Sequence, residues 1–183
     1  MNRSWSRRHF IQAGLFTAGI VTFNPGPGLS KADASSEISP APSGGSGQKL
    51  MDWQEKIMLA LQHEHGIVIQ YTNHCGKLHA QGLVDQAQIL EHIIHDEITH
   101  ARNLIHILSS AGLEPTLAVW PPKTDQQTRV MLTQDLAAEQ GAIALYQEIL
   151  KNDLPANARE KVHRAMEQEK SHEKLLSNLI QNL

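Results

Sequence analysis

Two Glu-x-x-His pairs and two isolated glutamates are the residues of this sequence whose types and spacing could do chemistry. A spacing of three residues places a carboxylate and an imidazole on the same face of a helix. One glutamate from each of two helices, with a Glu-x-x-His pair from each of two others, is the ligand set of a di-metal carboxylate centre in a helix bundle. The six candidate metal ligands are Glu64, Glu97, His100, Glu139, Glu169 and His172.

A third Glu-x-x-His pair, Glu160–His163, shows how specific this spacing is. It begins nine residues before Glu169, which corresponds to about 2.5 helical turns. We therefore expect the third pair to face away from the other two and to be a solvated surface pair without a metal role. Two pairs and two further glutamates in a shared layer indicate a metal site, whereas one pair alone would not.

Apolar residues recur at intervals of three and four along four stretches, which predicts four amphipathic helices. Gly82 separates the first helix from the second, and Gly112 ends the second. Thr124 or Asp125 could cap the third helix, and Pro155 lies near the first turn of the fourth. The predicted helices cover residues 50–79, 84–111, 124–151 and 155–182.

The four glutamates of the candidate set all lie near the midpoints of these helices. Midpoints meet in one layer whether neighbouring helices run parallel or antiparallel. Short connections make the first two helices, and the last two, antiparallel neighbours. The segment 112–123 could span ~40 Å when extended, roughly the length of the bundle. The predicted fold class is all-α: a four-helix bundle of two antiparallel hairpins joined by a long crossover.

Four carboxylates buried in one layer would repel one another and would be costly to desolvate. Two divalent cations would balance the four negative charges and remove this penalty. The alternative is that the six side chains form salt bridges or lie exposed. Cys75 is the single cysteine, so the chain cannot form an intramolecular disulfide, or a zinc or iron–sulfur site built on cysteines. We expect Cys75 to be buried in the first helix, and the alternative is an exposed thiol that could link two chains.

Residues 1–34 have the features of an export signal. Arg7 and Arg8 precede Phe-Ile and a short, weakly apolar run, and residues 32–34 (Ala-Asp-Ala) supply an A-x-A cleavage site. The paired arginines and their flanks resemble a twin-arginine signal, so we expect a periplasmic protein. The alternative is an uncleaved amphipathic anchor.

Residues 35–49 are rich in Ser, Gly and Pro and are predicted to form a disordered linker before the bundle at residues 50–183. Without residues 1–34, the chain would carry 12 Lys and Arg against 18 Asp and Glu, a net charge of about −6. An acidic domain binds nucleic acid and anionic membranes poorly and attracts cations. No run of 18 apolar residues predicts a transmembrane helix in the mature chain.

Four segments resemble the helix motifs of bacterioferritin, and the resemblance extends over about residues 50–182. The resemblance implies a ferritin-like fold and oxidation of Fe(II) to Fe(III) with O2 or H2O2, in iron detoxification or storage. It also implies a homo-oligomer, at least a dimer. The segments are residues 64–71, 96–101, 135–139 and 169–172.

The resemblance also implies roles for the candidate ligands. Glu97 and Glu169 would bridge two iron ions. Glu64 with His100 would hold one ion. Glu139 with His172 would hold the other.

Further residues near the implied site also have expected roles, two of them with an alternative. Tyr71 matches a tyrosine near the site in the family, where it could donate an electron or a hydrogen bond, but it could equally be a core residue. Asp135 lies one turn before Glu139 and could hold a ligand histidine through its ring N–H. His92 and Asp96 match an inner-surface iron site of some bacterioferritins, or else form an exposed contact one turn apart.

The sequence departs from bacterioferritin at several points. Ile98 occupies the position of the haem-ligating methionine, so we expect no haem by that route. The chain ends eleven residues after His172, so we expect no fifth helix, and a large cage is in question. Rubrerythrin is disfavoured, because one cysteine cannot build its cysteine-rich iron domain. The alternatives to a ferroxidase are a manganese or mixed-metal oxidase or catalase, and a metal-buffering module without turnover.

Overall fold

Four α-helices make up the part of the chain that the structure, a computed structural model, describes, namely residues 52–183. The predicted export signal at residues 1–34 and the linker at 35–49 lie outside this part. None of the four helices combines the length and the apolar character needed to cross a membrane. The helices are α2 (Asp52–Ala80), α3 (Val84–Ser110), α4 (Thr128–Leu150) and α5 (Ala156–Gln181).

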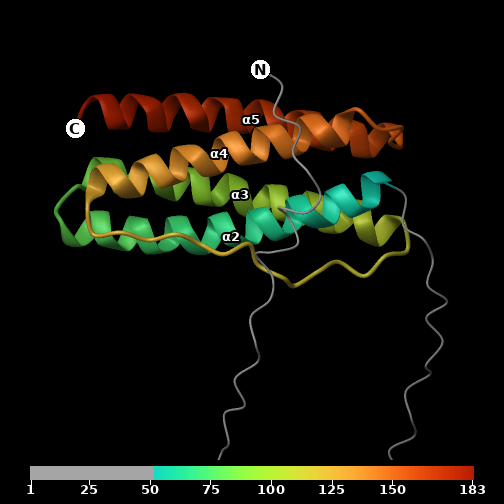
Figure 1. Cartoon of the computed structure of the whole chain (residues 1–183), viewed down its shortest axis with the longest axis horizontal. Coiled ribbons are helices and arrows are strands. Elements are labelled where there is room, and N and C mark those ends of the chain that lie inside the picture. Colours follow the sequence, from blue (N-terminus) through green and yellow to red (C-terminus); the bar gives the residue numbers. More distant parts are fainter. Residues whose placement is uncertain (1–51) are drawn as a thin grey trace, which may run out of the picture. The chain divides into compact units, whose positions relative to one another are not determined.

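The helices form two antiparallel hairpins, α2 with α3 and α4 with α5. The hairpins pack on each other through α2 and α4 and through α3 and α5. The segment between α3 and α4 runs lengthwise along the bundle from one end to the other (Figure 1). Helices α3 and α4 therefore run in the same direction. The predicted all-α bundle of two hairpins joined by a long crossover is confirmed.

Two glycines end the helices of the first hairpin. Gly82 follows α2 with a φ of 76°, and Gly112 follows α3 with a φ of 74°. Residues with a Cβ rarely adopt these angles, so glycine is the residue that lets the chain leave the helix here. The backbone N–H of the residue after each glycine bonds back to a carbonyl five residues earlier. Both helix ends lie where the sequence predicted them.

Helix α4 begins at Thr128, later than the predicted start at residue 124. Thr124 instead donates a hydrogen bond to Asn73 of α2 and accepts one from Lys77. Asp125 Oδ1 accepts the backbone N–H groups of the two residues that follow it. The predicted start was wrong because these two polar residues attach the crossover to α2 and form a turn of their own.

The crossover passes close to α2 at Gly66. The backbone N–H of Trp120 donates to the Gln62 carbonyl at 2.8 Å. A Cβ at Gly66 would lie 2.5 Å from the Trp120 carbonyl oxygen, which is too close for any side chain. Further along, the Lys123 backbone N–H donates to Gln70 Oε1 at 2.7 Å. These contacts fix the crossover along α2.

Candidate metal centre

Six ionisable side chains lie together in the interior of the bundle, at the middle of the four helices. None of the six is more than 3% exposed. Helices α2 and α4 each contribute one glutamate, and α3 and α5 each contribute a Glu-x-x-His pair. Burial of so many charged groups is costly unless their charges are compensated. The six residues are Glu64, Glu97, His100, Glu139, Glu169 and His172.

These side chains form two overlapping groups. Within each group, one ligand atom from every member lies within 4.8 Å of the others. Both groups contain Glu97 and Glu169, which we call the shared glutamates. Each group also has a glutamate and a histidine of its own. We call Glu64 with His100 the first half-site, and Glu139 with His172 the second half-site.

Both histidines direct Nδ1 toward the shared glutamates. His100 Nδ1 lies 3.0 Å from Glu97 Oε2 and 2.8 Å from Glu169 Oε1. His172 Nδ1 lies 3.0 Å from Glu97 Oε1 and 3.4 Å from Glu169 Oε2. Each imidazole therefore presents Nδ1, and not Nε2, to the space where a cation would bind.

The outward Nε2 atom of each histidine meets an acceptor from the opposite hairpin. His100 Nε2 lies 3.2 Å from Gln168 Oε1, and His172 Nε2 lies 3.3 Å from Asp96 Oδ2. An acceptor at Nε2 keeps the proton there and leaves the Nδ1 lone pair free for a metal. Such an outer partner is the usual companion of a metal-binding histidine.

Asp135 does not hold a candidate ligand histidine, so this expectation was wrong. Asp135 Oδ1 lies 2.8 Å from His74 Nδ1 and accepts a hydrogen bond from Gln70 Nε2 at 2.9 Å. His74 and Gln70 lie on the face of α2 that packs against α4, and both bind Oδ1 of this carboxylate. Because Gln70 also binds the backbone of Lys123, a buried chain of hydrogen bonds connects the crossover to the layer beside the centre.

Both tyrosines of the chain are fully buried, and each binds a glutamate of one half-site. The Tyr71 hydroxyl donates to Glu139 Oε1 at 2.6 Å and lies 2.9 Å from the Asp135 carbonyl oxygen. The Tyr146 hydroxyl donates to Glu64 Oε1 at 2.7 Å. The sequence reasoning missed Tyr146. It lies seven residues after Glu139, the same spacing that drew attention to Tyr71 after Glu64.

Several buried ligand atoms of the centre make no well-formed hydrogen bond among the described residues, although the two histidines approach most of them at ion-pair distance. Five carboxylate oxygens, drawn from all four glutamates, are in this position, as is His172 Nδ1. Unsatisfied buried polar atoms are costly, and they are rare in folded proteins. Carboxylate and imidazole atoms that converge in this way fit the coordination of two metal ions, and the donor set suits iron or manganese.

The carboxyl groups have shifted pKa values. Burial, followed by the charge of Glu97, raises the pKa of Glu64 and of Glu139 well above the ordinary value. Burial would also raise the pKa of Glu169, but hydrogen bonds with Glu139 and with both histidines lower it below the ordinary value. Glu64 and Glu139, which we call the terminal glutamates, thus retain protons more readily than Glu169.

The pKa values of the two histidines are raised, whereas burial lowers the pKa of an ordinary imidazole. Burial alone would lower the pKa of His100, but hydrogen bonds to Glu169 and Glu97 raise it to about 11. Burial likewise opposes protonation of His172, and hydrogen bonds led by that to Glu139 raise its pKa. Protons therefore occupy the positions at which a metal would bind, and metal binding must displace them.

Comparison with protein families identifies the bundle. The family model described as Rubrerythrin matches residues 55–180. This chain belongs to the rubrerythrin family. The expectation that disfavoured rubrerythrin was wrong. The cysteine count bears only on a cysteine-rich iron domain, whereas the match lies in the helices that carry the six candidate ligands.

Solved bacterioferritins share the fold of this rubrerythrin-family chain. The Rhodobacter capsulatus bacterioferritin, described with a metal-free dinuclear site and haem iron, superposes with a TM-score of 0.66 at 22% identity, covering 70% of this chain and 83% of that one. Mycobacterium tuberculosis bacterioferritin BfrA superposes with a TM-score of 0.67 at 18% identity, covering 73% and 87%. The fold is ferritin-like. No curated protein matches the sequence.

Other sequence-based predictions for this rubrerythrin-family chain have mixed outcomes. Glu160 and His163 are both exposed, as expected for a surface pair. Cys75 is buried at the end of α2, as expected. His92 is exposed, and Asp96 contacts His172, so an inner-surface iron site at His92 and Asp96 stays a prediction.

Proposed function

We propose that this rubrerythrin-family protein binds two iron ions at the centre and oxidises Fe(II) to Fe(III) with O2 or H2O2, in iron detoxification or storage. The convergence of buried carboxylate oxygens from all four glutamates with two imidazole Nδ1 atoms is the observation that supports it. Hard carboxylate ligands favour Fe(III) over Fe(II), and imidazole suits iron generally. The dinuclear site named for the Rhodobacter capsulatus bacterioferritin, which has the same fold, agrees with this proposal.

Each ligand has a distinct task in this proposal. The shared glutamates, Glu97 and Glu169, lie in both ligand groups and would hold the two ions next to each other. Each half-site would add one terminal carboxylate and one Nδ1 atom to its own ion. Two adjacent Fe(II) ions supply two electrons together to the oxidant. The four carboxylates balance the charge of two divalent ions once the protonated groups of the centre release their protons.

Tyr71 and Tyr146 hold the terminal glutamates in place. Each hydroxyl donates to one oxygen of a half-site glutamate, which leaves the other oxygen of Glu139 and of Glu64 free to bind an ion. Tyr71 is also buried beside the centre, where it could donate an electron during oxidation. The hydrogen-bond role has direct geometric support and is the one we favour.

The test compares the shared glutamates with the exposed Glu160–His163 pair. Glu97→Ala and Glu169→Ala should abolish fast Fe(II) oxidation, followed as O2 consumption, and should strongly reduce the metal-to-protein ratio, because each loss removes a ligand from both ions. Glu160→Ala and His163→Ala should behave like the unaltered protein. The proposal fails if all four variants turn over iron equally fast. Metal binding without O2 consumption would support a buffer instead, and faster turnover of Mn(II) would support a manganese oxidase.

We further propose that the protein is exported to the periplasm through the twin-arginine route. The basis is the Arg7-Arg8 pair with its flanking residues and cleavage site. That route carries folded proteins, so iron could be inserted before Zn(II) or Cu(II) of the periplasm competes for the centre. Replacing Arg7 and Arg8 with lysine should leave the precursor in the cytoplasm. Normal periplasmic accumulation of the double variant would contradict export by this route.

We also propose a homo-oligomer, at least a dimer, that binds no haem through Ile98. Ile98 is 49% exposed on α3, away from the centre, and isoleucine has no atom that can bind iron. Protein produced with haem available should therefore lack the Soret band of a bis-methionine haem, and such a band at stoichiometric intensity would refute the proposal. Light scattering on the same sample would measure the oligomer.

A further inference from the structure

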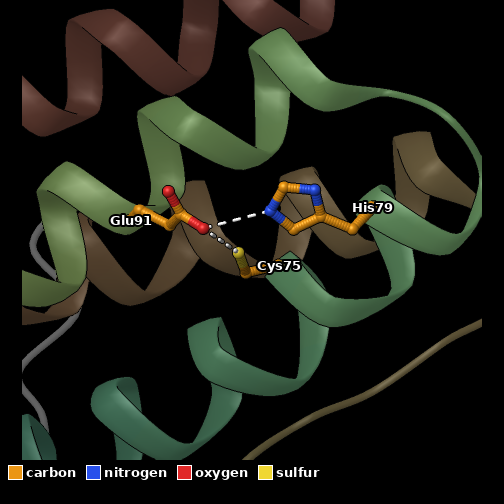
Figure 2. A group of neighbouring side chains, drawn as sticks. All are labelled: Cys75, His79 and Glu91. Atoms are coloured by element: carbon orange, nitrogen blue, oxygen red, sulfur yellow. Dashed lines mark hydrogen bonds and ion pairs between the residues drawn. The ribbon is translucent and has the colours of Figure 1, made fainter.

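A second group of metal-ligating side chains lies outside the centre, at one end of the first hairpin. Figure 2 shows Cys75 and His79 on α2 and Glu91 on α3, with their polar atoms turned toward one another. One ligand atom from each residue lies within 4.8 Å of the other two. His79 Nε2 lies 3.0 Å from Glu91 Oε1, and Cys75 Sγ lies 3.8 Å from the same oxygen.

We propose that Cys75, His79 and Glu91 bind a thiophilic divalent cation, with Zn(II) as the representative ion. Zinc prefers sulfur, nitrogen and oxygen ligands in a tetrahedron, and the bond lengths of such a site place neighbouring ligand atoms about 3.3–3.8 Å apart. The two separations that involve Glu91 Oε1 are already close to this range. One thiolate and one carboxylate also neutralise the charge of the ion.

The site is preorganised on two packed helices. Cys75 and His79 are four residues apart on α2, so both side chains lie on one helix face. Cys75 is only 7% exposed, and its thiol contacts the Ala87 carbonyl of α3 at 3.6 Å, which restricts the sulfur to this position. The His79 and Glu91 side chains are 42% and 54% exposed. An ion could therefore enter from solvent, with a water molecule as its fourth ligand.

Ligand chemistry separates this site from the centre. The centre offers carboxylates and imidazoles, which suit iron and manganese. The group of Cys75, His79 and Glu91, which we call the hairpin site, instead contains the only cysteine of the sequence. The two sites share no residue. Loss of His79 or Glu91 should therefore leave Fe(II) oxidation unchanged, and loss of a shared glutamate should leave the hairpin site intact.

Cobalt(II) provides a direct test, because a thiolate bound to cobalt gives a charge-transfer band in the near ultraviolet. The centre has no sulfur, so the band reports only the hairpin site. Titration of the full-length protein with Co(II) should produce the band, and added Zn(II) should remove it. Cys75→Ser should lose the band. His79→Ala and Glu91→Gln should each weaken Co(II) binding about tenfold or more, as expected for loss of one ligand of a tetrahedral site.

The controls exclude simpler explanations. His106→Ala removes an exposed histidine from α3 and should leave the band and its affinity unchanged. Glu97→Ala disables the centre and should retain the band, which separates this proposal from that of iron oxidation. The proposal is overturned if no thiolate band forms. It is also overturned if His79→Ala and Glu91→Gln bind Co(II) as tightly as the unaltered protein, because the thiol would then act alone. Both residues are exposed, so these variants do not endanger folding.

Discussion

The two half-sites of the centre are built alike, although they come from opposite hairpins. Each has a buried glutamate that accepts a hydrogen bond from a tyrosine, and a histidine whose Nε2 meets an acceptor from the other hairpin. Each tyrosine follows one terminal glutamate by seven residues and binds the terminal glutamate of the other half-site. The arrangement therefore has an approximate two-fold relation, in which each hairpin supports the ligands of its neighbour.

The half-sites differ in the acceptor that holds the histidine. At the first half-site, the acceptor of His100 is the neutral amide of Gln168, and at the second half-site the acceptor of His172 is the carboxylate of Asp96. These acceptors occupy equivalent positions, directly before Glu169 and Glu97. A carboxylate partner makes an imidazole a stronger ligand than an amide does. We infer that the second half-site would hold its ion more tightly.

The largest expected effect comes from removing one terminal glutamate. Glu64→Ala should lose the ion of the first half-site and retain that of the second, and Glu139→Ala should do the reverse. Because paired oxidation needs two ions, both variants should lose fast Fe(II) oxidation while retaining partial metal binding. Metal analysis and O2 consumption measure the two properties. Two ions retained in either variant would show that the half-sites are not separate.

The next largest effect is expected from replacing Asp96 or Gln168, the acceptors at Nε2 of the two histidines. Asp96→Asn should weaken metal binding at the second half-site by about 10–100-fold, the usual cost of losing an outer carboxylate partner. Gln168→Ala should have a smaller effect on the first half-site, because a neutral amide contributes less. Competition with a chelator measures both affinities. Equal losses in the two variants would remove the proposed difference between the half-sites.

The shared layer of the half-sites could be predicted from the sequence. Glutamates at the midpoints of four predicted helices must meet in a bundle, and the three-residue spacing puts His100 and His172 on the same face as their glutamates. Tyr146 was within reach of the same reasoning, because its spacing from Glu139 repeats that of Tyr71 from Glu64.

The partners of these residues could not be predicted in the same way. Which side chain meets Asp135 depends on which helix faces lie opposite each other, and His74 of α2 occupies that place. The approach of Glu91 to Cys75 and His79 depends on how far α3 is shifted along α2. The geometry of the turn at Gly82 determines this shift, and helical spacing alone does not predict it. Helical spacing fixes contacts along one helix, whereas contacts between helices depend on packing.

A more moderate effect is expected from pH on the stability of the metal-free protein. The two half-sites should contribute to it in the same direction. The pKa values of Glu64 and Glu139 are raised above 4.5, and that of His100 is raised from 6.5 to about 11. Groups that bind protons more tightly when folded stabilise the protein at low pH and lose this contribution as the pH rises through the folded-state pKa. The free energy of unfolding of chelator-treated protein should therefore fall as the pH rises from about 6 to about 9.

Bound metal should change this dependence, because it replaces the protons of the centre. The Tm of metal-loaded protein should vary less over the same pH range than the Tm of chelator-treated protein. Thermal unfolding at several pH values, with and without chelator, measures both. A Tm that rises with pH in the chelator-treated protein would contradict the raised pKa values.

The smallest expected effect compares the two tyrosines. Tyr71→Phe and Tyr146→Phe each remove one hydrogen bond to a terminal glutamate, which is worth about 1.5–3 kcal/mol when the acceptor is charged. Each should slow Fe(II) oxidation by about tenfold or more without loss of metal, because the glutamate is less well oriented but still present. Stopped-flow oxidation rates, with metal content measured on the same samples, test this expectation. A much larger loss for Tyr71→Phe, together with loss of a tyrosyl radical signal that Tyr146→Phe retains, would contradict equal positioning roles. It would instead make Tyr71 an electron donor, and the two half-sites would then differ in chemistry as well as in affinity.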